Sequence, residues 1–182
     1  MGGPAGAGHF SLSGDEGSDW GCPRGKSEAL PTNWSPLRRA SDASAAAALI
    51  LIDAGPLVAL VDSGDQHHAK CAAALAELRE PLATVWPPFV VAMYLLSDLP
   101  VAQEALWEML ERGAVLLLPL DSSDIPRIRE LMRKYANRRM DLADAALLRV
   151  AEREGLRKIF TVDRRDFSVY RLNNRTRPTL IP

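Results

Sequence analysis

The sequence predicts an α/β fold: one domain with a mostly parallel central sheet of about four to five strands, flanked by helices. From residue 49 onward, short apolar runs of strand length alternate with segments whose apolar residues recur at helical spacing. Continuous apolar runs are typical of parallel strands that are buried on both faces. At 182 residues, of which 47% are apolar and 25% charged, the chain is long enough to bury the core of one ordinary domain.

The first 48 residues differ from the rest in composition. They hold eight of the twelve glycines and few aliphatic side chains before the alanine run at 45–48. Such a segment cannot bury enough apolar surface to offset the entropy that it would lose on ordering. We therefore expect residues 1–48 to be a disordered or non-native extension and residues 49–182 to form the domain.

The first half of the domain is predicted to contain two strands and four helices. A run of leucine and isoleucine marks the first strand. Pro56 and the pair Pro87-Pro88 suit the first turns of helices, and Gly113 is placed to end one. The strands are expected at 49–52 and 83–86, and the helices at 56–61, 67–79, 87–96 and 101–112.

The second half is predicted to contain three strands and two helices. Ile125, Ile128 and Leu131 recur at helical spacing and give one helix an apolar face. Gly155 is placed to end the other helix. The strands are expected at 114–118, 159–162 and 178–181, and the helices at 121–135 and 140–154.

Two aspartates interrupt the second of these helices, which is otherwise apolar on all sides over 140–148. The i, i+3 spacing turns Asp141 and Asp144 to one face. Ionised carboxylates in a buried helix cost several kcal/mol unless positive charge or hydrogen-bond donors compensate them. Asp141 could alternatively be a helix N-cap, and Asp144 could form a structural salt bridge with Arg138 or Arg139.

Two further aspartates, Asp53 and Asp163, each follow a predicted strand directly. Ligands bind at that edge of a parallel sheet, although each residue alone could be a turn residue or a helix cap. If Asp53, Asp163, Asp141 and Asp144 converge, they repel one another and require a divalent cation. Carboxylate oxygens favour Mg²⁺ or Mn²⁺ over zinc.

Positive charge flanks these aspartates in a chain that is nearly balanced overall, with 22 basic and 23 acidic residues. The balance excludes a polycation that holds nucleic acid by bulk charge. Arg139 precedes the aspartate pair, and Arg164 and Arg165 follow Asp163. These arginines are candidates for phosphate contacts, the alternative being an ordinary solvated surface.

Cysteine content and hydropathy indicate the compartment. Cys22 and Cys71 are far apart and lack the spacing of metal ligands, which argues against a disulfide framework and a zinc site. No apolar stretch approaches the roughly 20 residues of a membrane span. We therefore expect a cytoplasmic protein that does not insert into membranes.

Several stretches together resemble one known family. They are residues 49–62, which begin with the first strand and Asp53; His67-His68; Trp86-Pro87 with 92–96; 140–145 around Asp141 and Asp144; and 161–167 around Asp163. In this order, over about residues 49–182, the chain resembles the PIN-domain ribonucleases, and within them the VapC-type toxins of toxin–antitoxin pairs.

The resemblance implies a single PIN-like domain and a chemistry. In the family, an acidic quartet binds Mg²⁺ or Mn²⁺, which activates water to hydrolyse RNA. By position, Asp53 matches the first acid, Asp144 the third with Asp141 beside it, and Asp163 the fourth. The resemblance also implies an RNA substrate contacted by the flanking arginines, a small antitoxin protein as partner and a homodimer. Thr161 could add a hydroxyl, although an ordinary strand threonine is the favoured interpretation.

The second acid of the quartet is missing. Family members usually have glutamate in the helix at 87–96, where this chain has Val91. Two hypotheses follow: a divalent-metal ribonuclease, or a catalytically impaired PIN-like module that binds RNA or a protein without cutting. A phospho-accepting receiver domain ranks below both, because it needs an acidic pair after the first strand, where Ala54-Gly55 stands.

Overall fold

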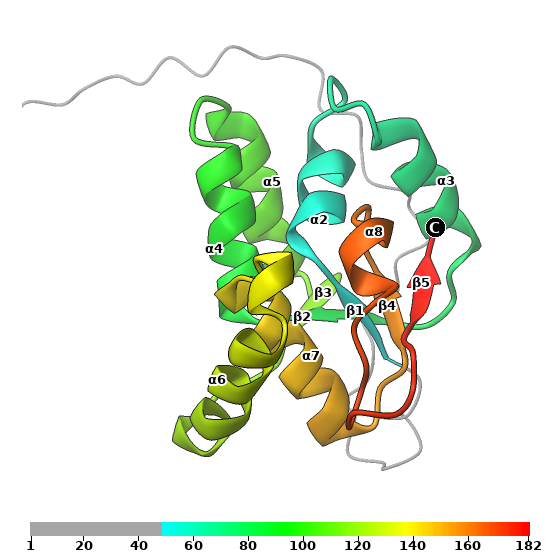
Figure 1. Ribbon diagram of the computed structural model, residues 1–182. Helices are drawn as coiled ribbons and strands as arrows, with labels where there is room; N and C mark the ends of the chain where they lie inside the picture. Colours follow the sequence, from blue (N-terminus) through cyan, green and yellow to red (C-terminus); the bar gives the residue numbers. More distant parts are fainter. Residues whose placement is uncertain (1–48) are drawn as a thin grey trace, which may run out of the picture. The chain divides into compact units, whose positions relative to one another are not determined.

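The computed structural model describes residues 49–182, and the extension predicted for residues 1–48 lies outside this range. Five strands form one sheet in the order β3-β2-β1-β4-β5, and every neighbouring pair is parallel (Figure 1). The strands are β1 (Ile50–Ile52), β2 (Leu82–Thr84), β3 (Val115–Leu117), β4 (Lys158–Phe160) and β5 (Thr179–Ile181). The predicted single α/β domain with a parallel sheet is thus confirmed.

Alternate residues of the central strand enter two separate cores, because successive side chains of a strand point to opposite faces. Ile50 and Ile52 pack into one apolar cluster, and Leu51 packs into the other. All three side chains are completely buried. Helices therefore cover both faces of the sheet, which explains why β1 reads as an uninterrupted apolar run.

Four helices contribute to the cluster around Ile50 and Ile52. They are α2 (Ala54–Val61), α3 (His68–Glu77), α4 (Trp86–Leu95) and α5 (Pro100–Glu111). Proline stands in the first turns of α4 and α5, as expected for a residue without a backbone donor. No helix within residues 49–182 is long and apolar enough to cross a membrane.

The opposite face is covered by α6 (Ile125–Lys134), α7 (Leu142–Glu154) and the short α8 (Arg164–Phe167), with two 3₁₀ turns at Ser122–Asp124 and Ala136–Arg138. Leu147 and Leu148 of α7 are completely buried in this second core. Gly155 ends α7 in the left-handed conformation, as its position in the sequence predicts.

Several predicted boundaries differ from the structure by two or more residues, and three of the differences have a clear local reason. The helix expected at 121–135 is a 3₁₀ turn followed by α6, because Asp121 and Asp124 form a reciprocal capping box. The helix expected from 140 begins at Leu142, since Asp141 is its N-cap. The strand expected at 83–86 ends at Thr84, because Trp86 already belongs to α4.

The strand order places a topological switch point between β1 and β4. From β1 the chain runs outward through β2 to β3 on one side, whereas β4 and β5 occupy the other side. The connections that leave β1 and β4 at their carboxyl ends therefore diverge, and a crevice opens between them. Asp53 follows β1, and Asp163 follows β4 after two residues.

Candidate active site

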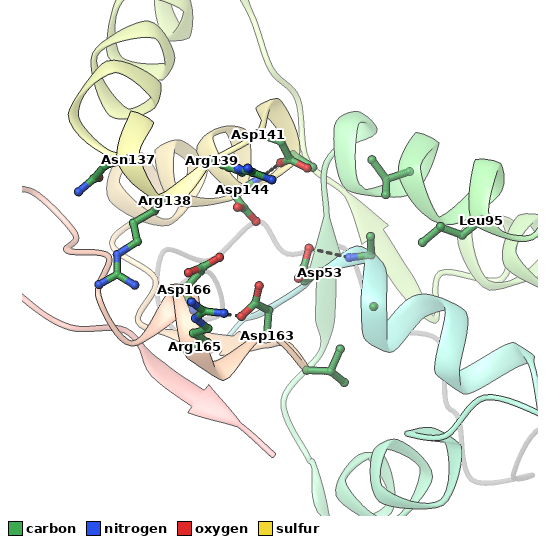
Figure 2. Close-up of a pocket in the computed structure, with 15 residues that line it drawn as sticks. Asp53, Leu95, Asn137, Arg138, Arg139, Asp141, Asp144, Asp163, Arg165 and Asp166 are labelled. Carbon is green, nitrogen blue, oxygen red and sulfur yellow. Dashed lines mark hydrogen bonds between the residues drawn. The ribbon is translucent and has the colours of Figure 1, made fainter.

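A cavity of about 800 Å³ lies at this switch point (Figure 2). Aspartates line its centre, arginines lie along one side, and small or aliphatic side chains of α2, α4 and the segment after β4 complete it. The lining residues include Asp53, Asp141, Asp144, Asp163 and Asp166, with Arg138, Arg139 and Arg165. All four aspartates that the sequence singles out thus face one cavity.

Asp53 is held rigidly at the end of β1. Its Oδ1 accepts the Ala54 N–H at 2.7 Å and so caps α2, while its Oδ2 accepts the Thr161 hydroxyl at 2.9 Å. The same hydroxyl accepts the backbone N–H of Asp163 at 3.1 Å. Thr161 is therefore more than the ordinary strand threonine that the sequence favours: it connects the first acid with the fourth.

Burial gives Asp53 an unusual affinity for protons. Its residue surface is only 8% exposed, and burial raises the pKa of its carboxyl from 3.8 to about 6 against the opposing effect of the two hydrogen bonds. Repulsion from Asp141 and Asp163 adds to the increase. No salt bridge to a protein cation relieves this charge within residues 49–182.

Gly55 allows the two strand ends to approach. A Cβ built on Gly55 would lie 2.5 Å from Cγ2 of Val162, which is closer than real Cβ atoms approach a neighbour. Glycine at this position therefore keeps the first turn of α2 against the segment between Thr161 and Asp163. Any larger residue would force the Val162 side chain or the first turn of α2 to move.

The pair on α7 has two different environments. Asp141 is the N-cap, and its Oδ1 accepts the Asp144 N–H at 2.9 Å. Asp144 lies in the first turn of α7, where its Oδ2 accepts the Tyr170 phenol O–H at 3.0 Å. Burial, followed by repulsion from Asp53 and Asp141, raises the pKa of Asp144 to about 7.

Of the alternative interpretations of these aspartates, the structure of residues 49–182 confirms helix capping and shows no salt bridge at Asp144. The capping role is confirmed for Asp141, and Asp53 and Asp163 also cap helices. A carboxylate has about four acceptor sites, so a cap leaves sites free toward the cavity. The salt bridge considered between Asp144 and Arg138 or Arg139 is not formed.

Asp166 is a cavity residue that sequence reasoning missed. It lies in the first turn of α8, and its backbone N–H donates to Oδ1 of Asp163 at 3.0 Å. Figure 2 shows its side chain beside Asp163 and Asp144. The i, i+3 spacing of Asp163 and Asp166 repeats that of Asp141 and Asp144, and this repetition was a signal that could have found it.

Two of the three predicted phosphate-contacting arginines line the cavity. They are Arg139 and Arg165, and Arg138 joins them. Arg164 does not line the cavity: its guanidinium donates to the carbonyl of Pro182. Successive helical residues point about 100° apart, so Arg164 and Arg165 cannot serve the same side of α8.

Arg139 adopts a backbone conformation that is uncommon for arginine. Its φ of 56° lies in the left-handed region, where it ends the 3₁₀ turn at Ala136–Arg138. A residue with a Cβ costs roughly 1–2 kcal/mol in that region. The turn nevertheless brings Arg138 and Arg139 to the cavity, and only Met140 separates Arg139 from the N-cap of α7.

One side of the cavity carries no acid. Val91 and Leu95, one turn apart on α4, line it, and Leu95 is 58% exposed. Val91 therefore occupies the place in the cavity at which the resemblance leads us to expect glutamate. Asp98, three residues beyond Leu95, is exposed and does not line the cavity.

The donor chemistry of the cavity fits a hard divalent cation. Its centre offers only carboxylate oxygens, which are the preferred ligands of Mg²⁺ and Mn²⁺. The pKa values of Asp53 and Asp144 are raised by the same causes, burial first and then repulsion from neighbouring aspartates, and a bound cation would oppose both. Within residues 49–182, no three side chains of His, Cys, Asp or Glu lie close enough together to hold an ion. The structure therefore does not define a coordination geometry.

Comparisons with known proteins agree with this fold. The family model of the PIN domain matches residues 50–172. Ribonuclease VapC26 of Mycobacterium tuberculosis is 32% identical over 137 residues, which are 73% of this chain and 100% of that protein. The crystal structure of M. tuberculosis VapC20, described as a toxin that cleaves the sarcin-ricin loop, has a TM-score of 0.57 at 19% identity and covers 63% of this chain and 91% of that one.

The two kinds of comparison support different conclusions. At 19% identity the VapC20 structure shows a shared fold alone. The family match spans more than half of the chain and includes Asp53, Asp141, Asp144 and Asp163, and the VapC26 alignment covers that relative completely. This chain therefore belongs to the PIN-domain family, among its VapC-type members.

Proposed function

We propose that this protein is a divalent-metal-dependent ribonuclease that hydrolyses RNA phosphodiester bonds as the toxin of a toxin–antitoxin pair. The observation that carries the proposal is the convergence of Asp53, Asp144 and Asp163, from three separate segments, on one cavity with arginines along its side. The names of the relatives support it, since VapC26 is called a ribonuclease and VapC20 a toxin.

The carboxylates are proposed to hold Mg²⁺ or Mn²⁺. Asp53 and Asp144 are the principal ligands, and Asp163 and Asp141 hold the ion or its waters. When bound, such an ion supplies an activated water for hydrolysis and offsets the charge that develops on the leaving oxygen. The protein orients its acids beforehand, through the Thr161 hydroxyl at Asp53 and the backbone caps at Asp141 and Asp163.

The two sides of the cavity suit the two parts of an RNA chain. Arg138, Arg139 and Arg165 make no salt bridge within residues 49–182, so their guanidinium groups are available to phosphates. The side formed by Val91 and Leu95 is apolar and can accept the face of an unstacked base. A scissile phosphate between the two sides would then lie near the aspartates.

The second candidate function is an impaired PIN-like module that binds RNA or a protein without cutting. Val91 favours it, because a valine at the cavity can neither coordinate a metal nor orient a water. Loss of even an outer-shell partner of a metal site typically lowers metal affinity or activity about 10–100-fold. The ribonuclease proposal allows for this reduction: Asp141 and Asp166 remain at the same cavity.

A small antitoxin protein and a second copy of this chain are the proposed protein partners. Large apolar side chains are exposed on α4 and α5, among them Tyr94 at 77% and Val101 at 76%. Exposed apolar surface of this kind is typical of protein interfaces. An RNA substrate and the free thiol of Cys71 are consistent with the cytoplasm as the proposed location.

The test is an RNA cleavage assay with the purified full chain in Mg²⁺, Mn²⁺ or EDTA. The ribonuclease proposal expects cleavage that requires the cation and is lost in Asp144→Asn. Val91→Glu should cleave faster than the wild type. If the wild type binds RNA but cleaves none, and Val91→Glu restores cleavage, the impaired module is the correct function.

A further inference from the structure

Tyr170 contacts an acid of the cavity but does not line the cavity itself. Its phenol oxygen lies 3.0 Å from Oδ2 of Asp144, and the phenol donates in this hydrogen bond. The residue is completely buried, and the cavity-lining residues do not include it. Tyr170 therefore contacts Asp144 from the side opposite the cavity, outside the space in which a substrate or an ion would lie.

We propose that Tyr170 is a positioning residue, whose hydroxyl holds the Asp144 carboxylate in the orientation that metal binding and RNA cleavage require. This inference rests on the proposed function. The phenol has a single O–H donor, and it is committed to one carboxylate oxygen. No other protein group within residues 49–182 donates to the Asp144 side chain, so this bond alone fixes the rotation of its carboxylate.

The phenol itself is held immobile by its packing. The Tyr170 ring lies 4.9 Å from the ring of Tyr135 and 5.3 Å from that of Phe167, centroid to centroid, in tilted and edge contacts. Both neighbours belong to the same apolar core as the buried side of α7. A donor fixed in a rigid core can orient a carboxylate without the entropy cost that a mobile donor would add.

The bond from Tyr170 also affects how the Asp144 carboxylate faces the other acids of the cavity. Asp144 is surrounded by Asp53, Asp141 and Asp163, which repel it. Without a fixed donor, its carboxylate would rotate away from these neighbours toward solvent. The Tyr170 hydroxyl opposes that rotation, and Asp144 remains directed at the acids with which it is to share a cation (Figure 2).

The core offers a matched control. Tyr135 is a second buried phenol in contact with Tyr170, but its oxygen accepts the backbone N–H of Arg171 at 3.1 Å and bonds to no carboxylate. Tyr170→Phe and Tyr135→Phe therefore remove the same atom from the same cluster. Only the first removes a donor from an acid of the cavity.

The experiment compares the wild type and both variants as full chains. Mn²⁺ affinity is measured by calorimetry, folding by thermal melting, and kcat and KM on a single-stranded RNA. Tyr170→Phe is expected to bind Mn²⁺ about 10–100-fold more weakly than the wild type, with a similar loss in kcat and little change in KM. Tyr135→Phe is expected to match the wild type in Mn²⁺ affinity and kcat.

Each other outcome overturns the inference in a recognisable way. If Tyr170→Phe binds Mn²⁺ as the wild type does, the hydroxyl does not position Asp144. If both variants weaken Mn²⁺ binding equally, the effect is one of core packing. If the wild type itself binds no Mn²⁺, the proposed function fails first, and the role of Tyr170 in metal binding fails with it.

Discussion

Replacing Asp144 by asparagine should stabilise the metal-free protein, although the same change should abolish cleavage. Burial, followed by repulsion from nearby aspartates, raises the pKa of Asp144 from 3.8 to about 7. Each pKa unit corresponds to about 1.4 kcal/mol, so at pH 8 the ionised carboxyl destabilises the folded state by at most about 4 kcal/mol. Because the side chain is only partly buried, solvent screening reduces the expected gain to about 1–2 kcal/mol.

The sign of this effect depends on pH. Above about pH 7 Asp144 is ionised in the folded and unfolded states, and the wild type carries the whole cost. Below about pH 4 it is protonated in both states, so the cost disappears. Asparagine has no charge at any pH and keeps a side-chain oxygen that can accept the Tyr170 O–H. The advantage of the variant should therefore shrink as the pH falls from 8 toward 4.

Urea unfolding in EDTA measures this gain, at pH 8 and again near pH 4.5. Asp98→Asn is the matched control, because Asp98 is exposed and away from the cavity; it should change stability by less than about 0.5 kcal/mol. Added Mn²⁺ should raise the stability of the wild type more than that of Asp144→Asn. If Asp144→Asn is no more stable than the wild type in EDTA at pH 8, Asp144 is not under electrostatic strain and the reasoning is wrong.

Three further predictions concern the pH dependence of stability, a buried ion pair and the backbone at Arg139. The metal-free wild type should lose stability as the pH rises from about 4 to 7. In that range the raised pKa values of Asp53 and Asp144 let the folded state bind more protons than the unfolded chain. A melting temperature in EDTA that increases with pH would contradict this prediction. Asp124→Asn should cost about 2–3 kcal/mol in urea unfolding, since this fully buried carboxylate accepts from both Arg149 and Arg153; a loss below about 1 kcal/mol would show that the pairs contribute little. Arg139→Gly should be more stable than Arg139→Ala by about 1 kcal/mol, because the position requires positive φ. Both Arg139 variants should bind RNA more weakly and with a smaller salt dependence than the wild type, and unchanged RNA affinity would remove Arg139 from the interface.

The strands and the acids on them were predictable because their signals are local. β1 is a short apolar run followed directly by Asp53, and β4 ends in Ile159-Phe160, with Asp163 after two further residues. Parallel strands bring such residues to one edge. The spacing of Asp141 and Asp144 placed both on one side of α7. Alternating strands and helices predict a parallel sheet, and the strand order, which the structure supplies, brings these segments to one cavity.

The residues that support the acids were not predictable in the same way. Tyr170 meets Asp144 across a separation of 26 residues, and nothing in its neighbourhood distinguishes it from a core aromatic residue. The choice between Arg164 and Arg165 depends on the direction of each side chain from the short helix α8, which the sequence did not reveal. Such contacts arise from packing between distant segments, whereas periodicity and capping act within a few residues.

The capping aspartates show that one residue can be both a helix cap and a residue of the candidate site. Asp53, Asp141 and Asp163 each accept a backbone N–H at the start of a helix, and each also lines the cavity. A helix N-terminus favours negative charge, which helps to hold several carboxylates near one another. The caps therefore contribute to building the acidic centre.

The central claim is that the aspartates act on RNA through an activated water, and the chemistry of the product ends tests it most directly. A defined RNA is cut by the full chain in Mg²⁺ or Mn²⁺, and the ends are identified by mass spectrometry. Attack by water yields a phosphate monoester on one product and a hydroxyl on the other, with no cleavage in EDTA. A 2′,3′-cyclic phosphate, or cleavage that persists in EDTA, would show that the ribose 2′-hydroxyl is the nucleophile and would contradict the account.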